Sequence, residues 1–240
     1  MSRSTLSKFS LGALTAAALA VTALVASPLL AAEEAVVIPA PANEVESATG
    51  MQTAVLAGGC FWGVQGVFQH TAGIANVVSG YSGGEKSTAT YNSISSGTTG
   101  HAEAVEIKYD PKQISYGKIL QIFFSVAHDP TQLNRQGPDS GTQYRSEIFA
   151  TTADQKKIAD SYVAQLNDAK VYPKPIVTKI SSLKAFYPAE AYHQDYLTLH
   201  PNQPYIAIND IPKVENLKKL FGQNYIEKPT LVSGARVTSN

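Results

Sequence analysis

A single cysteine, Cys60, is the feature that most limits how this chain of 240 residues can be built. It excludes an internal disulfide framework, a cysteine-clamped zinc site and an intramolecular dithiol relay. An apolar content of 44% with 16% charged residues is nonetheless that of a folded globular chain. If Cys60 takes part in chemistry, the second thiol must come from another molecule.

The charges of the chain are balanced, with 19 Lys and Arg residues and 19 Asp and Glu residues. A chain with this balance has no long-range field to attract phosphates, so we expect no nucleic-acid partner. The five histidines lack a metal-ligand spacing, and there is no dinucleotide-binding motif or P-loop. We therefore expect neither a metal nor another cofactor.

Residues 1–32 are typical of a secretory signal peptide. Arg3 and Lys8 supply positive charge, and a largely apolar, uncharged run follows from Leu11 to Ala26. That run is short for a membrane span, so we expect cleavage after Ala32, with an uncleaved anchor as the alternative. The mature protein is then exported, to the periplasm, with no stable membrane insertion after cleavage.

Beyond this segment, short β-like runs alternate with amphipathic helical ones. Before them, residues 33–50 are rich in Ala, Pro and Glu and predict a flexible linker. The alternation predicts one α+β domain over 51–205 with a mixed sheet and packed helices, then a C-terminal surface segment over 206–240. Strands are expected at 53–57, 73–81, 102–109, 145–151 and 176–180, and helices at 60–70, 116–127, 152–170 and 214–221.

Cys60 lies where a predicted strand gives way to a predicted helix. Gly58 and Gly59 precede it and allow a sharp turn that leaves the thiol accessible, while Phe61 and Trp62 follow it. At a helix N-terminus the amide groups and the helix dipole favour a thiolate, so Cys60 is a candidate nucleophile. The alternative is a small buried hydrophobic side chain, which is a common role for a free cysteine.

Three further segments concentrate polar groups. Glu103 alternates with alanines at the start of a strand, where desolvation would raise its pKa and make it a proton donor near neutral pH. A solvated glutamate on a sheet face is the alternative. The stretch 135–146 is either a ligand-binding loop at a strand entrance or an ordinary polar loop. The stretch 186–196 combines tyrosines with an acid and a histidine, which could bind a polar group or simply pack on the core.

Together these segments resemble the A-type peptide methionine sulfoxide reductases. The motifs cover about residues 51–200 in the family order: GGCFWG at 58–63, GYSGG at 80–84, GHAEAV at 100–105, HDPTQ at 128–132, GTQYRS at 141–146 and AEAYHQDY at 189–196. The resemblance implies a two-layer α+β fold with a mixed sheet, related to the ferredoxin-like class. It also implies repair of oxidative damage by reduction of methionine-S-sulfoxide, free or in proteins, to methionine.

The resemblance assigns roles position by position. Cys60 matches the nucleophile, and Glu103 matches the acid that protonates the sulfoxide oxygen. Phe61 and Trp62 match the pocket for the S-methyl group. Tyr91 and Tyr144 match the two hydroxyls that hold the oxygen, and Asp139 matches a carboxylate that orders a water. The outer rim is matched by Glu190, His193 and Tyr196.

The sequence departs from the family pattern at three places. Gln65 stands where many members have Glu, and we expect little effect because Glu103 carries the acid role. Ala191 replaces a rim residue and removes one expected hydrogen bond. The C-terminal resolving cysteines are absent, which makes this a one-cysteine member. A sulfenic acid on Cys60 must then be reduced by an external thiol, either a thioredoxin-like protein or a small thiol.

Three other functions fit parts of the sequence. A thiol peroxidase would need a cation beside Cys60, and comparing turnover of hydrogen peroxide with that of a methyl sulfoxide separates it. A non-enzymatic module that holds methionine-rich peptides would keep its function in Cys60→Ser. Acyl transfer by a Cys–His pair is the third, although the sequence places no histidine clearly beside Cys60.

Overall fold

A six-stranded sheet forms the centre of the protein. The computed structural model describes residue 1, residues 34–44 and residues 49–232, so the predicted signal peptide lies outside the described residues except for its first. Neighbouring strands run antiparallel, apart from the parallel pair β6 and β7. In spatial order the strands are β7 (Lys179–Ser182), β6 (Ser146–Ala150), β1 (Gln52–Gly58), β3 (Ala102–Tyr109), β2 (Ile74–Ser82) and β8 (Phe186–Pro188).

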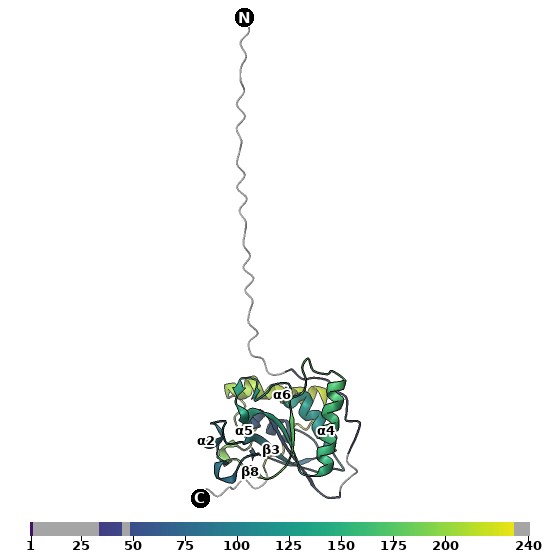
Figure 1. Ribbon diagram of the computed structural model, residues 1–240, viewed down its shortest axis with the longest axis vertical. Helices are drawn as coiled ribbons and strands as arrows, with labels where there is room; N and C mark the ends of the chain where they lie inside the picture. The colour runs from purple at the N-terminus through teal and green to yellow at the C-terminus, as the bar shows by residue number, and fades with distance from the viewer. Residues whose placement is uncertain (2–33, 45–48, 233–240) are drawn as a thin grey trace.

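The helices cover one face of this sheet. In Figure 1, α6 lies along the top of the folded body and α4 along its right side, while α2, α5 and β8 gather on the left. The predicted α+β class with a mixed sheet is confirmed. The helices are α1 (Phe61–Gln69), α2 (Tyr91–Ile94), α3 (Tyr116–Ile122), α4 (Ala153–Asp168), α5 (Tyr196–Leu199) and α6 (Ile211–Leu220).

Short elements connect these helices and strands. Two of them are single π-helical turns, one extending α3 and the other leading into α6. A small hairpin and three 3₁₀ turns lie in the loops. These elements are η2 (Phe123–Ala127) and η5 (Ile206–Asp210), the hairpin β4 (Arg135–Gln136) and β5 (Asp139–Ser140), and the turns η1 (Lys86–Thr88), η3 (Thr142–Tyr144) and η4 (Ala191–His193).

Strand alternation divides the apolar residues between two cores. On β1, Leu56 faces the helices and joins the large core, while Val55 faces away and joins a smaller cluster. On β3, Val105 and Ile107 share the helix-covered face. Any side chain in step with Val105 therefore points toward the helices, and Glu103 is one of these.

Side-chain caps begin two of the predicted helices where the sequence places them. Ser115 accepts a hydrogen bond from the Lys118 N–H at 3.0 Å at the start of α3, and Thr152 accepts one from the Gln155 N–H at 3.1 Å at the start of α4. Such caps satisfy amide groups that have no partner inside the helix. The strand expected at 176–180 starts later, at 179, because the Val177 N–H donates to the Pro130 carbonyl and not to β6.

The linker predicted at 33–50 is wrong for residues 34–44, the longer of its two described stretches. Ile38 is only 6% exposed and belongs to the main core. The Val36 N–H donates to the Ser125 carbonyl at 3.0 Å, and the Tyr162 hydroxyl donates to the Pro39 carbonyl at 2.6 Å. The composition is that of a linker, but side chains distant in sequence satisfy the extended backbone. We call residues 34–44 the N-terminal strap.

The surface segment predicted at 206–240 is also wrong for its first part. Ile206, Asp210 and Leu217 are fully buried, and α6 begins at Ile211 with a proline in its first turn. Gly63 of α1 allows this close packing, because a Cβ there would clash with the side chain of Asp210. The C-terminal segment thus completes the core. Among the helices of residues 34–44 and 49–232, none combines the length and the apolarity that crossing a membrane requires.

Candidate active site

A glycine turn presents Cys60 at the N-terminus of α1, as the sequence predicts. Gly59 has a φ of +88°, which favours glycine, and a Cβ there would lie 2.5 Å from the side chain of Gln136. Cys60 is the N-cap residue of α1 and is 7% exposed. The thiol is therefore largely shielded from solvent, so the accessible position expected from the sequence is wrong, and the turn that positions it tolerates no larger residue at 59.

Glu103 lies directly beside this helix start. It is 2% exposed, and its Oε2 accepts a hydrogen bond from the Phe61 N–H at 3.0 Å. Alternation places it on the helix-covered face, so Ala102 and Ala104 lie on the opposite face and do not form its pocket. Burial raises the pKa of Glu103 to about 8, while the Phe61 N–H opposes this rise. At neutral pH the carboxyl is mostly protonated and can donate a proton.

The Cys60 thiol is protonated in the resting site, contrary to the thiolate that its helix position predicts. Burial raises the pKa of Cys60 well above its ordinary value, and the carboxyl groups of Asp210, Glu103 and Asp139 add to this rise. The Trp62 N–H donates to the sulfur and acts in the opposite direction. Local helix geometry favours the thiolate, but burial and neighbouring acids outweigh it.

Two tyrosine hydroxyls lie near both groups. Tyr91 is the first residue of α2 and Tyr144 the last of η3. Burial raises the pKa of each, and the charges of Glu103 and Cys60 contribute to both shifts. Both hydroxyls therefore stay protonated. The structure brings together Cys60, Glu103, Tyr91 and Tyr144 as the sequence predicts.

Asp139 occupies the same region, on β5. Its carboxylate accepts a hydrogen bond from the hydroxyl of Tyr205. Burial raises the pKa of Asp139, whereas the Tyr205 hydrogen bond and the charge of Lys213 lower it. Asp139 therefore links the loop before β6 to the C-terminal segment.

The predicted methyl-binding pair divides into one buried and one partly exposed ring. Phe61 is fully buried, with its ring 5.9 Å from that of Tyr81. The Trp62 ring stacks on that of Tyr196, with centroids 4.0 Å apart and an interplanar angle of 11°. The Trp62 Nε1–H donates to His193 Nδ1 at 3.2 Å. Trp62 thus joins α1 to the rim residues that the sequence predicts.

Glu190 holds α2 in place. Its carboxylate accepts hydrogen bonds from the Tyr91 N–H at 2.9 Å and from the Tyr81 hydroxyl at 2.7 Å. Although partial burial opposes the change, these hydrogen bonds lower the pKa of Glu190. His193 is buried, and burial lowers its pKa while the Glu190 charge acts against the shift. Ala191, between them, begins η4 and is exposed.

Gln65 makes more contacts than the expected small effect implies. Its Nε2 donates to the Val77 carbonyl and to Gln194 Oε1, both at 3.0 Å. Its Oε1 accepts from the Asp195 N–H at 2.9 Å. An ionised glutamate could not donate these bonds, so the amide suits this position. Gln65 anchors the segment that carries Tyr196.

Sequence reasoning missed three residues of the C-terminal segment. Tyr205 contacts the Trp62 ring at 6.1 Å as well as Asp139. Asp210 and Lys213 form a buried ion pair, with 3.5 Å between Oδ1 and Nζ. A pair of opposite charges three residues apart beside Pro212 was the available signal, since such pairs share a helix face. Because these residues lie far from Cys60 along the chain, no local pattern indicates that they pack near it.

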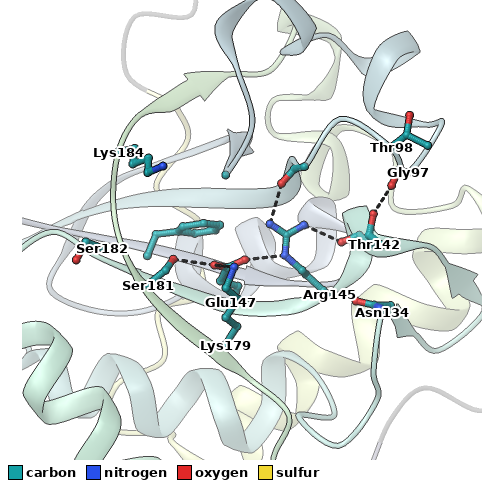
Figure 2. A pocket seen from close by; sticks show the side chains of 13 residues that line it. Gly97, Thr98, Asn134, Thr142, Arg145, Glu147, Lys179, Ser181, Ser182 and Lys184 are labelled. Carbon is teal, nitrogen blue, oxygen red and sulfur yellow. Dashed lines mark hydrogen bonds and ion pairs between the residues drawn. The ribbon is translucent and has the colours of Figure 1, made fainter.

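A clamp behind the site fixes the loop that carries Tyr144. Figure 2 shows the Arg145 guanidinium surrounded by acceptors. Its Nε donates to Glu147 Oε2 at 2.6 Å, and Nη1 donates to the carbonyls of Thr142 and His101 at 2.9 and 3.1 Å. Its Nη2 donates to the Gly100 carbonyl at 3.0 Å. Arg145 therefore ties η3 to the chain that enters β3.

A cavity of about 540 Å³ opens beside this clamp, on the sheet face away from the helices. Its lining includes Glu147 and Phe149, which alternate with the core residue Ile148. None of the site residues predicted from the sequence lines it. We assign the chemistry to the Cys60 cluster and not to this cavity.

The cluster combines a thiol with a protonated acid and two hydroxyls. A substrate oxygen bound among Glu103, Tyr91 and Tyr144 would receive a proton and hydrogen bonds, while the atom bonded to it faced the Cys60 sulfur. Across residue 1, residues 34–44 and residues 49–232, no group of three or more His, Cys, Asp or Glu side chains could hold a metal ion. The arrangement can transfer an oxygen atom from a polar, uncharged substrate to the Cys60 sulfur.

Comparison with known proteins gives one family throughout. The family model described as peptide methionine sulfoxide reductase matches residues 52–225. A peptide methionine sulfoxide reductase MsrA 2 of Mesorhizobium japonicum is 63% identical over 190 residues, covering 79% of this chain and 97% of the relative. An MsrA 2 of Synechocystis is 48% identical over 196 residues, covering 80% and 90%.

Solved structures agree with the sequence relatives. Mxr1 of Saccharomyces cerevisiae in reduced form superimposes with a TM-score of 0.59 at 34% identity, covering 68% of this chain and 92% of that one. Methionine sulfoxide reductase A of Corynebacterium diphtheriae gives a TM-score of 0.56 at 32% identity, covering 72% and 89%. The match of the family model to residue 225 includes α6, in agreement with its place in the core.

Proposed function

Because the chain belongs to the peptide methionine sulfoxide reductase family, we propose that Cys60 is the nucleophile with which it reduces methionine-S-sulfoxide to methionine. The family activity is that of a thiol-dependent oxidoreductase that repairs oxidised methionine. The observation that supports the residue assignment is the hydrogen bond that the Phe61 N–H, next to Cys60 in the chain, donates to the buried Glu103 carboxyl, whose pKa is raised.

The chemistry follows from these two groups. Glu103 donates a proton to the sulfoxide oxygen while the hydroxyls of Tyr91 and Tyr144 hold that oxygen. The protonated sulfoxide sulfur becomes electrophilic, and the Cys60 sulfur attacks it as the thiol proton returns to the Glu103 carboxylate. Transfer of the oxygen to Cys60 then releases methionine and leaves a sulfenic acid. Atoms balance, because one thiol and one sulfoxide give one sulfenic acid and one thioether.

An external thiol completes the cycle. The chain has one cysteine, so a first external thiol condenses with the sulfenic acid to form a mixed disulfide and water. A second external thiol attacks this disulfide, which releases Cys60 and the oxidised reductant. A thioredoxin-like protein supplies both thiols in one molecule, whereas a small thiol reacts twice.

We also propose export to the periplasm, on the basis of the charged and apolar pattern of residues 1–32. The mature protein then begins at Glu33. Cell fractionation followed by intact mass measurement tests this. A periplasmic chain that lacks residues 1–32 supports it, and a chain in the cytoplasm that retains them contradicts it.

Single-turnover reduction of each methionine sulfoxide epimer tests the residue assignment. Pre-reduced protein without added reductant should give one methionine per chain from the S epimer only, and Cys60 should gain one oxygen by intact mass. Cys60→Ser should give none. Product from Cys60→Ser, or efficient turnover of hydrogen peroxide without turnover of sulfoxide, would contradict the proposal.

A further inference from the structure

A buried ion pair of the C-terminal segment packs against the first turn of α1. Asp210 is fully buried at the end of η5, and Lys213, in the first turn of α6, is 5% exposed. The Lys213 Nζ lies 3.5 Å from the Asp210 Oδ1. A buried pair of this kind adds little net stability, because the loss of hydration offsets the attraction between the charges. The position of the pair is therefore more informative than its contribution to folding.

Gly63 shows where the pair lies relative to the reactive sulfur. It follows Cys60 by three residues, so the two share a face of the helix. A Cβ on Gly63 would lie 2.2 Å from the Asp210 Oδ1 and 3.2 Å from the Lys213 Nζ. Both charges thus rest on the helix turn that begins at Cys60, and only glycine leaves room for them there.

Charged and titratable groups surround the thiol from several elements. The carboxyl groups come from β3, β5 and η5, and Lys213 brings a positive charge from α6 into the same region. The acid of η5 has the largest effect on Cys60 after burial itself. The groups are Glu103, Asp139 and Asp210, the ammonium of Lys213, the hydroxyls of Tyr91, Tyr144 and Tyr205, and at the rim Glu190 and His193.

We propose that Asp210 and Lys213 are positioning residues that control the charge on Cys60. Asp210 adds to the effect of burial that keeps the resting thiol protonated, and Lys213 limits the negative charge that collects around the sulfur when Cys60 ionises. A protonated resting thiol reacts slowly with oxidants, since the thiolate is the nucleophile. Asp210 therefore disfavours ionisation of the resting thiol. The inference rests on the proposed role of Cys60 as the nucleophile.

Titration of the thiol tests this without any substrate. The ultraviolet absorbance of the thiolate is followed against pH, with Cys60→Ser as the blank, and the single cysteine makes the signal unambiguous. Asp210→Asn should move the midpoint to lower pH by roughly one unit, the size expected for removal of a nearby like charge. Lys213→Met should move it to higher pH by a smaller amount. Lys218→Met, which removes an exposed charge from the same helix, should leave it unchanged.

Opposite shifts distinguish a controlling pair from a merely structural one. A structural role would move neither midpoint, or would move both in the same direction through partial unfolding, and either result would overturn the proposal. Where a single variant fails to fold, the double variant Asp210→Asn/Lys213→Met decides, because it buries no charge at these positions. Its midpoint should lie below that of the wild type, since Asp210 acts more strongly on the thiol. An equal or higher midpoint would also overturn the proposal.

The result is independent of whether the sulfoxide is reduced. If the midpoints shift as stated but neither epimer is consumed, the proposed function fails and the control of Cys60 stands. If sulfoxide is reduced but the midpoints do not shift, the proposed control of Cys60 fails and the proposed function stands. In an active enzyme, the pH profile of single turnover should move with the thiol midpoint of each variant.

Discussion

At the scale of single residues, the protonation of Glu103 controls the proposed reaction. Its carboxyl has a raised pKa of about 8, so it holds its proton at neutral pH and loses it as the pH rises through that value. Acid catalysis by such a group contributes roughly 10²–10⁴-fold to a rate. The same pKa shift also means that the folded protein loses stability as the pH rises from the ordinary value of Glu toward 8.

The single-turnover rate should therefore fall as the pH rises through about 8. Glu103→Gln should lower the rate at neutral pH by about 100-fold or more and abolish this fall, because an amide does not ionise. Rates measured across the pH range with the S epimer check both effects. Glu106→Gln, on the same strand but the opposite face, is the matched control and should retain the wild-type profile. A Glu103→Gln profile identical to that of the wild type would assign the acid role elsewhere.

At the scale of elements, the catalytic groups depend on contacts between loops and strands. Tyr144 directly precedes Arg145 in the chain. Arg145 donates to the His101 carbonyl, and Glu103 lies two residues after His101. Arg145 therefore fixes the hydroxyl of η3 relative to the acid of β3. The sequence could predict both residues from their motifs, but the clamp depends on tertiary contacts that no local pattern encodes.

Arg145→Lys should lower kcat by about 10-fold or more while KM changes less. A lysine keeps the charge but cannot bind three carbonyls and Glu147 in one fixed plane, so the two groups lose their relative position. Steady-state kinetics with a methyl sulfoxide measure the effect. Lys179→Met removes another cation that contacts Glu147, at 3.5 Å, but leaves the clamp intact. A loss of kcat in Lys179→Met without a loss in Arg145→Lys would show that charge alone matters, and equal losses would contradict a specific role of the clamp.

His128 joins η2 to β6 in its neutral form. Its ring nitrogens lie 3.1 Å from the Phe123 carbonyl and 2.7 Å from the Ser146 hydroxyl. Burial lowers the pKa of His128 to about 3, whereas the unfolded chain takes up this proton near pH 6.5. A lowered pKa for a base means that acid favours the unfolded state, so the stability lost through this residue grows as the pH falls from 6.5 toward 3.

The free energy of unfolding should fall by about 1.4 kcal/mol for each pH unit below 6.5 through His128. His128→Gln should remove this part of the slope even if it lowers stability overall. Urea unfolding at a series of pH values measures the slope for each protein. The same slope in His128→Gln would mean that other groups cause the loss.

At the scale of the whole molecule, two segments distant from the motifs complete the fold. The strands around Leu56 and Val105 and the helices capped by Ser115 and Thr152 follow local patterns, and the sequence predicts these elements. The N-terminal strap and the segment from Tyr205 to Lys213 were not predicted, because their burial depends on partners far along the chain. The raised pKa of Cys60 was missed for the same reason, since C-terminal groups help to cause it.

Ile38→Ala should lower the free energy of unfolding by about 2–4 kcal/mol, the usual cost of truncating a buried Ile. The Ile38 side chain fills the core beneath the N-terminal strap, and its loss leaves a cavity. Val37→Ala is the matched control because Val37 is 80% exposed, and its effect should stay within about 0.5 kcal/mol. Equilibrium unfolding of both variants compares the two. Equal effects would mean that the strap adds no core contact.

The C-terminal segment packs against the first turn of α1, and this contact also sets the order in which the protein can mature. A growing chain emerges with its N-terminus first, so Cys60 is synthesised before Tyr205, Asp210 and Lys213. Until these residues dock against Gly63 and Trp62, the nascent chain carries a thiol without its final cover. Newly made chains therefore pass through an interval in which this sulfur is open to oxidants and to other thiols. Maturation of the enzyme ends only when its last helix is in place.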